Sequence, residues 1–225
     1  VIGDFNATDP DANATLSFSI SGPNAPLFSI DQNGTLVTNV IFDFENNASN
    51  YNLLVRVTDQ HSAFLEVSKN IVLKNRNESP ESITPSNTSF FENQPIGTLI
   101  GDFNATDPDA NSTFTYSISG SNSQLFNIDP NGSLVTNAIF DFESNASQYT
   151  LLIRATDEHN GSIEISQDIL LKNSNEPPST LALSNTTFFE NTQIGILVGS
   201  INATDPDANS TLSYSFSDGN GSHSN

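Results

Sequence analysis

The chain has 225 residues, of which 26 are Asp or Glu and only 6 are Lys or Arg, so its formal net charge is −20. This charge repels phosphate backbones, which excludes nucleic acid as an expected partner and favours a hard cation as counter-ion. The chain has no Cys, which excludes disulfides and thiolate metal sites. No apolar run approaches the roughly 18 residues of a membrane-spanning helix, so we expect no direct membrane insertion.

The sequence repeats itself with a period of 98 residues. Residues 2–13 recur at 100–111 and, with several substitutions, at 198–209. A period near 100 fits one small domain, whereas solenoid units have about 20–50 residues. We therefore expect three tandem modules: a first at 1–78 that lacks its first strand, a complete second at 79–176, and the N-terminal part of a third at 177–225.

Each module is expected to consist of β-strands. Tyr51, Leu53 and Val55 alternate with mostly polar residues, which is typical of a strand with one buried face. Asn131-Gly132 lies between two apolar runs and predicts a hairpin. In the second module the pattern predicts strands at 87–91, 98–105, 113–119, 125–129, 133–140, 149–155 and 163–172. Seven short antiparallel strands in about 95 residues predict an all-β, Greek-key β-sandwich.

Strand direction places the acidic motifs. If successive strands alternate in direction, the loops after odd strands face the next module and the loops after even strands face the previous one. One junction would then gather Asp43, Glu45, Glu78, Asp107, Asp109 and Asp157, with the oxygen atoms of Asn77. The other would gather Glu92, Asp141, Glu143, Glu176, Asp205 and Asp207, with Asn175. The repeat gives Asp9, Asp11, Asp59 and Glu190 the corresponding places in the incomplete modules.

Six converging carboxylates repel one another unless a cation neutralises them. Ca²⁺ accepts six to eight oxygen ligands in irregular geometry, whereas Mg²⁺ requires a tight octahedron. Zinc and copper prefer imidazole or thiolate, and neither is placed at these motifs. These residues therefore predict that the junctions bind calcium.

At these motifs the chain resembles the cadherin repeat family. The resemblance is carried by Phe-Glu-Asn-Gln-Pro-Ile-Gly-Thr at 91–98, Ala-Thr-Asp-Pro-Asp at 105–109, Asp-Phe-Glu at 141–143, Ala-Thr-Asp at 155–157 and Asn-Ser-Asn-Glu-Pro-Pro at 173–178. The form of these motifs is similar to that in the cadherin-like repeats of large bacterial surface or secreted proteins. The resemblance implies tandem seven-stranded β-sandwiches of the cadherin or immunoglobulin type, joined end to end and stiffened by Ca²⁺.

The resemblance also implies a function outside the cell. A cadherin array at the cell surface, in a larger membrane-anchored or secreted protein, would mediate adhesion to itself, to other surface or matrix proteins, or to glycans. The chain has no Trp, so adhesion by exchange of an N-terminal Trp is not expected. The alternatives are a passive spacer or a glycan-binding module beside an enzyme or lectin domain. We expect no enzymatic activity, because the carboxylates recur in every module without an aromatic cleft.

Overall fold

The computed structural model describes residues 1–216, and within them the chain is built almost entirely from β-strands. By its internal contacts the chain divides into two units. The first unit contains Val1–Ser79 together with Asp107–Asn111, and the second contains Pro80–Thr106 and the residues from Ser112 onward. The loop at Asp107–Asn111 is therefore grouped with the strands of the first unit, although it follows a strand of the second.

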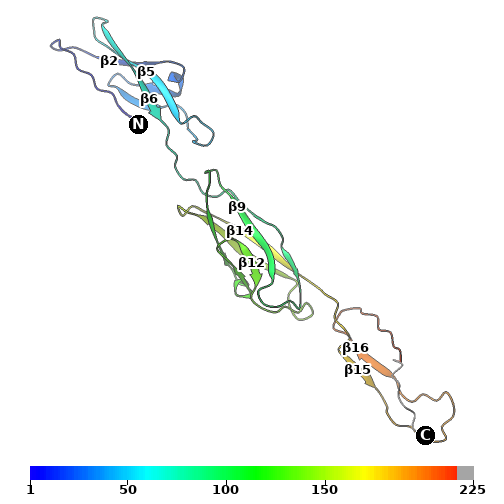
Figure 1. The fold of residues 1–225 in the computed structure, drawn as a ribbon. Coiled ribbons are helices and arrows are strands. Elements are labelled where there is room, and N and C mark those ends of the chain that lie inside the picture. The colour runs from blue at the N-terminus through cyan, green and yellow to red at the C-terminus, as the bar shows by residue number, and fades with distance from the viewer. Residues whose placement is uncertain (217–225) are drawn as a thin grey trace. The chain divides into compact units, whose positions relative to one another are not determined.

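The first unit holds two three-stranded sheets, ordered β1-β4-β3 and β2-β5-β6. All pairs are antiparallel, and β5 is the central strand of the second sheet (Figure 1). A short 3-10 helix, η1 (Ala25–Leu27), precedes β3. The strands are β1 (Gly3–Asp4), β2 (Ser17–Ser21), β3 (Phe28–Ile30), β4 (Thr35–Thr38), β5 (Asn50–Thr58) and β6 (Phe64–Val72).

The second unit contains a complete sandwich of two four-stranded sheets, ordered β11-β12-β9-β7 and β10-β13-β14-β8. Seven of the strands alternate in direction, so the first and last of them, β8 and β14, pair in parallel. The 3-10 helix η2 (Ser123–Leu125) precedes β11. The strands are β7 (Ser82–Pro85), β8 (Ser89–Phe91), β9 (Leu99–Thr106), β10 (Phe114–Ser119), β11 (Phe126–Ile128), β12 (Ser133–Thr136), β13 (Gln148–Asp157) and β14 (Ser162–Lys172).

The sandwich confirms the all-β fold but corrects two of its expected strands. The single strand expected at 87–91 is preceded by a second one, and the two join different sheets: β7 pairs with β9, whereas β8 pairs with β14. The strand expected at 133–140 ends at Thr136, because the Thr136 hydroxyl and backbone bond to Pro95 and Thr98 instead of extending the ladder. Phe140 is nevertheless buried.

The core of the sandwich follows the alternation in the sequence. Along β13, Tyr149, Leu151, Ile153 and Ala155 are buried while the residues between them are more exposed. The Phe140 ring packs edge-on against Tyr149, with ring centroids 5.2 Å apart. The first unit has a smaller core of the same kind, and the two clusters supply the hydrophobic burial that stabilises each sandwich.

The expected hairpin at Asn131-Gly132 is confirmed between β11 and β12. Asp129 Oδ1 accepts the backbone N–H groups of Asn131 and Ser133, both at 2.9 Å. Gly132 has a φ of 97°, and a Cβ atom at this position would lie 2.4 Å from the carbonyl oxygen of Phe103. The turn therefore requires glycine for both its backbone angle and its close approach to β9.

The chain after the sandwich begins the same fold again. β15 (Thr180–Leu183) and β16 (Ile201–Thr204) form an antiparallel pair whose register, Thr180 opposite Thr204, repeats that of Ser82 and Thr106 in β7 and β9. Of the third module expected at 177–225, the last nine residues lie outside the part of the chain that the structure describes. No helix in the described part is long and apolar enough to cross a membrane.

Candidate metal centres

Three carboxylates of the first unit form what we call the first acidic cluster: Glu45, Glu78 and Asp109. One carboxylate oxygen of each lies within 4.8 Å of those of the other two. Glu45 lies in the loop between β4 and β5, Glu78 follows β6, and Asp109 belongs to the Asp107–Asn111 loop. The strand directions predicted that Glu45 and Glu78 lie together, because β4 and β6 were expected to run in the same direction within one module.

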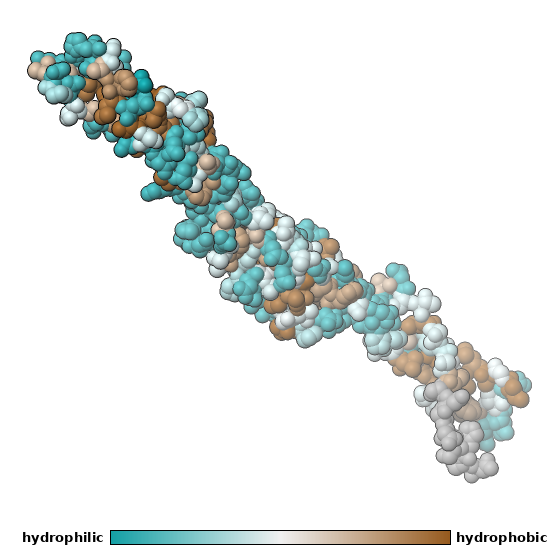
Figure 2. All heavy atoms as spheres, turned by 45° about the horizontal axis from the view of Figure 1, so that its top comes forward, coloured by the Kyte–Doolittle hydropathy of each residue, from teal (hydrophilic) through white to brown (hydrophobic). Residues whose placement is uncertain are grey.

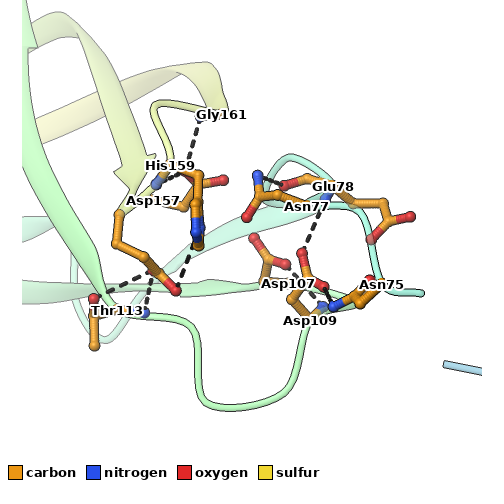
Figure 3. A network of polar contacts seen from close by, with 10 residues as sticks. Asn75, Asn77, Glu78, Asp107, Asp109, Thr113, Asp157, His159 and Gly161 are labelled. Carbon is orange, nitrogen blue, oxygen red and sulfur yellow. Dashed lines mark hydrogen bonds and ion pairs between the residues drawn. The ribbon is translucent and has the colours of Figure 1, made fainter. Parts of the chain in front are cut away.

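Hydrogen bonds hold Asp109 in this cluster (Figure 3). Asp109 Oδ2 accepts the backbone N–H of Glu78 at 2.9 Å, and its Oδ1 accepts the side-chain amide of Asn75 at 2.6 Å. Asp107 Oδ1 accepts the N–H of Asp109 at 2.9 Å. The other carboxylate oxygen of Asp107 is buried and has no hydrogen-bond partner. A buried carboxylate oxygen in this state is costly unless a cation or a water satisfies it.

The second acidic cluster consists of Glu92, Glu143 and Glu176. Glu143 and Glu176 lie 98 residues after Glu45 and Glu78, and are their counterparts in the repeat. The carboxylate oxygens of the three members also lie within 4.8 Å of one another. Glu92, directly after β8, is fully buried and accepts the N–H of Phe142 at 2.5 Å and that of Ser174 at 2.8 Å. These two bonds fix one carboxylate at the base of the cluster.

Glu176 connects this cluster to the loop after β16. Its backbone N–H donates to Asp207 Oδ2 at 2.8 Å, which repeats the bond from Glu78 to Asp109. Its Oε1 accepts the side-chain amide of Asn93. Its Oε2 is buried and has no hydrogen-bond partner. A buried carboxylate oxygen without a hydrogen-bond partner is therefore present at both clusters. At the first cluster it belongs to the neighbouring Asp107, and at the second it belongs to Glu176 itself.

The crowding of carboxylates changes their acidity. Loss of solvent contact, and after it the negative charges of Glu45, Asp109 and Asp43, raise the pKa of Glu78. The pKa of Glu176 is raised by loss of solvent contact and then by Glu92, Glu143 and Asp207. The ionised form of each group is therefore destabilised in the protein, which is the expected state of a cation site without its cation.

Glu143 follows the same rule. Loss of solvent contact is the largest cause of its raised pKa, and the carboxylates of Glu92, Asp207 and Asp141 add to it. Asp43 differs, because the hydrogen bond from the Asn46 side chain lowers its pKa.

Several predicted ligands also shape their own loops. Asp43 Oδ1 accepts the N–H of Glu45, and Asp141 Oδ1 accepts that of Glu143. Asp59 accepts the N–H groups of His61 and Ala63, and Asp157 accepts those of His159 and Gly161. Asp9 accepts from Asp11, and Asp205 accepts from Asp207. Each of these groups thus uses one oxygen for its turn. In Asp43 and Asp141 the second oxygen also accepts a side-chain hydrogen bond, from Asn46 and from Ser144 respectively.

The remaining predicted residues divide into two groups. The Asn77 and Asn175 side chains donate to the carbonyl oxygens of Glu78 and Glu176, so they brace the backbone beside each cluster. Glu190, the counterpart of Glu92, is exposed. Sequence reasoning missed Asn93, which bonds to Glu176; its φ of 58° marks a turn, and an Asn directly after the buried Glu92 was the available signal.

The donor set fits a hard divalent cation. Both clusters present only oxygen atoms, and no Lys or Arg forms an ion pair with Glu92, Glu143 or Glu176 among the residues from 1 to 216. Anionic oxygen ligands in irregular loops suit Ca²⁺, whereas Zn²⁺ and Cu²⁺ favour nitrogen and sulfur.

Comparison with known proteins identifies the family. A model of the cadherin domain matches residues 1–72 and 86–169. Human Protocadherin Fat 4 is 32% identical over 234 residues, covering 96% of this chain and 5% of the relative. The Protocadherin-like wing polarity protein stan of Drosophila melanogaster is 32% identical over 232 residues, covering 94% of this chain and 6% of the relative. The chain thus spans only about a twentieth of the length of these relatives.

Solved structures agree with this assignment. Mouse Cadherin-23 EC22-24 aligns with a TM-score of 0.66 at 22% identity, covering 91% of this chain and 70% of that one. Human Protocadherin-24 EC1-2 aligns with a TM-score of 0.62 at 24% identity, covering 78% of this chain and 88% of that one. At these identities the similarity to solved structures establishes the fold alone. The match to the cadherin domain model over most of the sequence establishes the family, and the chain belongs to the cadherin family.

Proposed function

We propose that this chain is a calcium-binding segment of an extracellular adhesion protein, made of three cadherin repeats at 1–78, 79–176 and 177–225. The observation that carries the proposal is the clustering of carboxylates at Glu45 and Glu78 and again, 98 residues further on, at Glu143 and Glu176. Each cluster also has one buried carboxylate oxygen without a hydrogen-bond partner, at the non-equivalent positions Asp107 and Glu176. A solvated acidic turn has no need of such an arrangement, because water would satisfy its oxygens.

The ligands divide between the two clusters. In the first unit the cation is bound by carboxylates from three loops, with main-chain or amide oxygen from Asn77; these are Asp43, Glu45, Glu78, Asp107 and Asp109. In the second unit the equivalent carboxylates act with Asn175; these are Glu92, Asp141, Glu143, Glu176, Asp205 and Asp207. Asp157, which the sequence grouped with Asp107 and Asp109, is a further proposed ligand. The others are Asp9, Asp11, Asp59 and Glu190, which hold the corresponding places in the incomplete modules.

A matched pair of variants tests the calcium proposal. Asp107→Ala removes an acid that has a buried oxygen without a partner, whereas Asp102→Ala removes an exposed acid from β9. Both changes alter the net charge equally. In calorimetric titrations of the whole chain with Ca²⁺, Asp107→Ala should weaken binding at one class of site by about tenfold or more, and Asp102→Ala should change it little. Equal effects would show that bulk charge governs binding and would overturn the proposed ligands.

The cadherin relatives support adhesion as the biological role and a place outside the cell. The partner is a second cadherin surface, another surface or matrix protein, or a glycan. Beads coated with the chain should aggregate in millimolar Ca²⁺ and disperse in chelator if the repeats themselves adhere. Beads that bind calcium but neither aggregate nor bind cells would favour the spacer function. No enzymatic activity is proposed, since the relatives are cadherins.

A further inference from the structure

The complete sandwich has four edge strands, and three of them are short. β8 and β11 have three residues each, and β7 has four, one of which is Pro85. Short strands and proline prevent a sheet edge from pairing with another chain. The fourth edge strand, β10, has six residues and neither of these features, and its register with β13 is unbroken. We call the outer side of β10 the open edge.

The open edge also lacks charge. The sequence of β10 is Phe-Thr-Tyr-Ser-Ile-Ser at 114–119, and its counterpart in the first module is Leu-Ser-Phe-Ser-Ile-Ser at 16–21. Thr115, Ser117 and Ser119 are exposed, and the residues that alternate with them are half-buried. Six residues of high β propensity without charge, Pro or Gly are typical of segments that pair with identical segments.

The first module has the same edge. β2 is the outer strand of the sheet β2-β5-β6, as β10 is of the sheet β10-β13-β14-β8 (Figure 1). Each of the two strands is followed by a glycine with a left-handed φ, Gly22 or Gly120, and then by a 3-10 helix. The open edge is therefore a property of the repeat itself.

Half of the backbone polar groups of β10 point away from its neighbour in the sheet. Alternate residues of an antiparallel pair form the hydrogen bonds between the strands. The N–H of Asp157 donates to Gly161 at 2.9 Å, so Asp157 bonds toward β14 and Thr156 bonds toward Thr115 of β10. The residues of β10 whose N–H and C=O groups point toward the open edge are therefore Phe114, Tyr116 and Ile118.

Charge favours the open edge as the place where two copies of the chain meet. The formal net charge is −20, and hydrophilic residues cover much of the face that Figure 2 shows. Contact between two copies through surfaces that carry Asp or Glu is opposed by repulsion of like charges. An uncharged strand avoids this repulsion, and its N–H and C=O groups match those of an identical strand.

We propose that β10 of one copy pairs with β10 of a second copy, antiparallel and about a two-fold axis at Tyr116. Tyr116 then faces Tyr116 of the second copy and Phe114 faces Ile118, with two backbone hydrogen bonds for each facing pair. A register shifted by two residues would leave one of these residues unbonded in each copy. The interface is closed, since the same surface serves in both copies.

This pairing gives a surface for adhesion to a second copy. Its biological role rests on the proposed function, whereas the contact itself does not depend on calcium. Because β2 and β10 both offer an open edge, one chain can pair at two places, and a second contact made by chains already joined strengthens the association.

Cross-linking tests the register. Thr115 and Ser117 face each other across the two-fold axis, with Cα atoms about 4.5 Å apart, within the roughly 4.4–6.8 Å that a disulfide spans. Because the chain has no Cys, mixing a Thr115→Cys chain with a Ser117→Cys chain under oxidation should give a mixed disulfide dimer.

Each cysteine chain alone is the control for the register. Two copies of the same cysteine lie diagonally across the pair, about 7–8 Å apart. Each chain alone should therefore link to itself far more slowly than the mixture forms the mixed dimer. Equal rates would overturn the register.

Sedimentation velocity over a range of concentrations tests whether the open edges hold copies together. The wild-type chain should associate as its concentration rises, and Ser19→Glu combined with Ser117→Glu should weaken the association by about tenfold or more, because like charges then meet at both edges. The control combines Ser68→Glu with Ser166→Glu, which adds the same charge at exposed positions of β6 and β14 and should change the association little. A chain that stays monomeric, or equal losses for the two double variants, would overturn the proposal.

Both assays are run in chelator and again in millimolar Ca²⁺. Association through the open edge in both conditions supports the contact whether or not the chain binds calcium. A chain that binds calcium but stays monomeric in both conditions would overturn the contact and leave the calcium proposal intact.

Discussion

Replacing Glu92 by Ala should destabilise the complete sandwich even when no calcium is present. Its buried carboxylate accepts two backbone N–H groups, from Phe142 at 2.5 Å and from Ser174 at 2.8 Å. Each buried donor left without an acceptor costs about 1–3 kcal/mol, which sets an upper range of about 2–6 kcal/mol for the pair.

Two effects place the expected loss in the lower part of that range. Water can reach the N–H of Ser174, which lies in an exposed residue. Removing the charge also relieves its repulsion of Glu143 and Glu176. We therefore expect a loss of about 2–3 kcal/mol, which lowers the melting temperature of a domain of this size by roughly 8–24 °C.

The matched control is Glu190→Ala, which changes the same residue type 98 positions further on. Glu190 is exposed and accepts no hydrogen bond within the described residues, so its loss should stay within about 0.5 kcal/mol. Amide hydrogen exchange, measured in chelator on a dilute solution of the protein, gives the free energy of unfolding that exposes the backbone N–H groups of Leu151 and Ile153 on β13. Equal protection in the two variants would refute the structural role of the buried carboxylate.

The remaining predictions concern acidity and backbone angle. Because their pKa values in the folded chain are raised above the ordinary 4.5, Glu143 and Glu176 bind protons more tightly when the protein is folded. In chelator, thermal melts should therefore show stability rising as the pH falls from about 7 toward about 5, and saturating Ca²⁺ should remove this trend; a stability that falls over the same interval in chelator would contradict the charge crowding. Gly132→Ala should destabilise the sandwich by more than about 2 kcal/mol in urea titrations, because a φ of 97° is combined with a 2.4 Å clash. Gly97→Ala, at a φ of 89° with open space around its Cβ, should cost only about 1 kcal/mol, and equal losses would show that the clash is relieved by movement.

The sequence predicted those parts of the fold that depend on local pattern. The alternation at Tyr149 and Leu151 placed a strand with one buried face, and Asn131-Gly132 placed a hairpin. Both signals act within a few residues, since alternation selects the buried face and a left-handed φ favours glycine. The convergence of Glu45 with Glu78 also followed from the sequence, because strand direction alone decides which loops meet.

Features that depend on contacts between distant residues were not predictable in the same way. The division of the first strand into β7 and β8 depends on the Asn87 side chain, which bonds to Ile100 and lets the chain pass from one sheet to the other. The burial of Glu92 depends on N–H groups 50 and 82 residues away. The bond from Asn93 to Glu176 joins two loops whose separation no local pattern encodes.

Crystals of the chain grown in calcium, with the ions located from their anomalous scattering, test the central claim most directly. The account predicts a calcium ion at about 2.3–2.6 Å from carboxylate oxygens of Glu92, Glu143 and Glu176, and an equivalent ion at Glu45, Glu78 and Asp109. Calcium ions bound only at other acidic surfaces, with both clusters occupied by water alone, would contradict it.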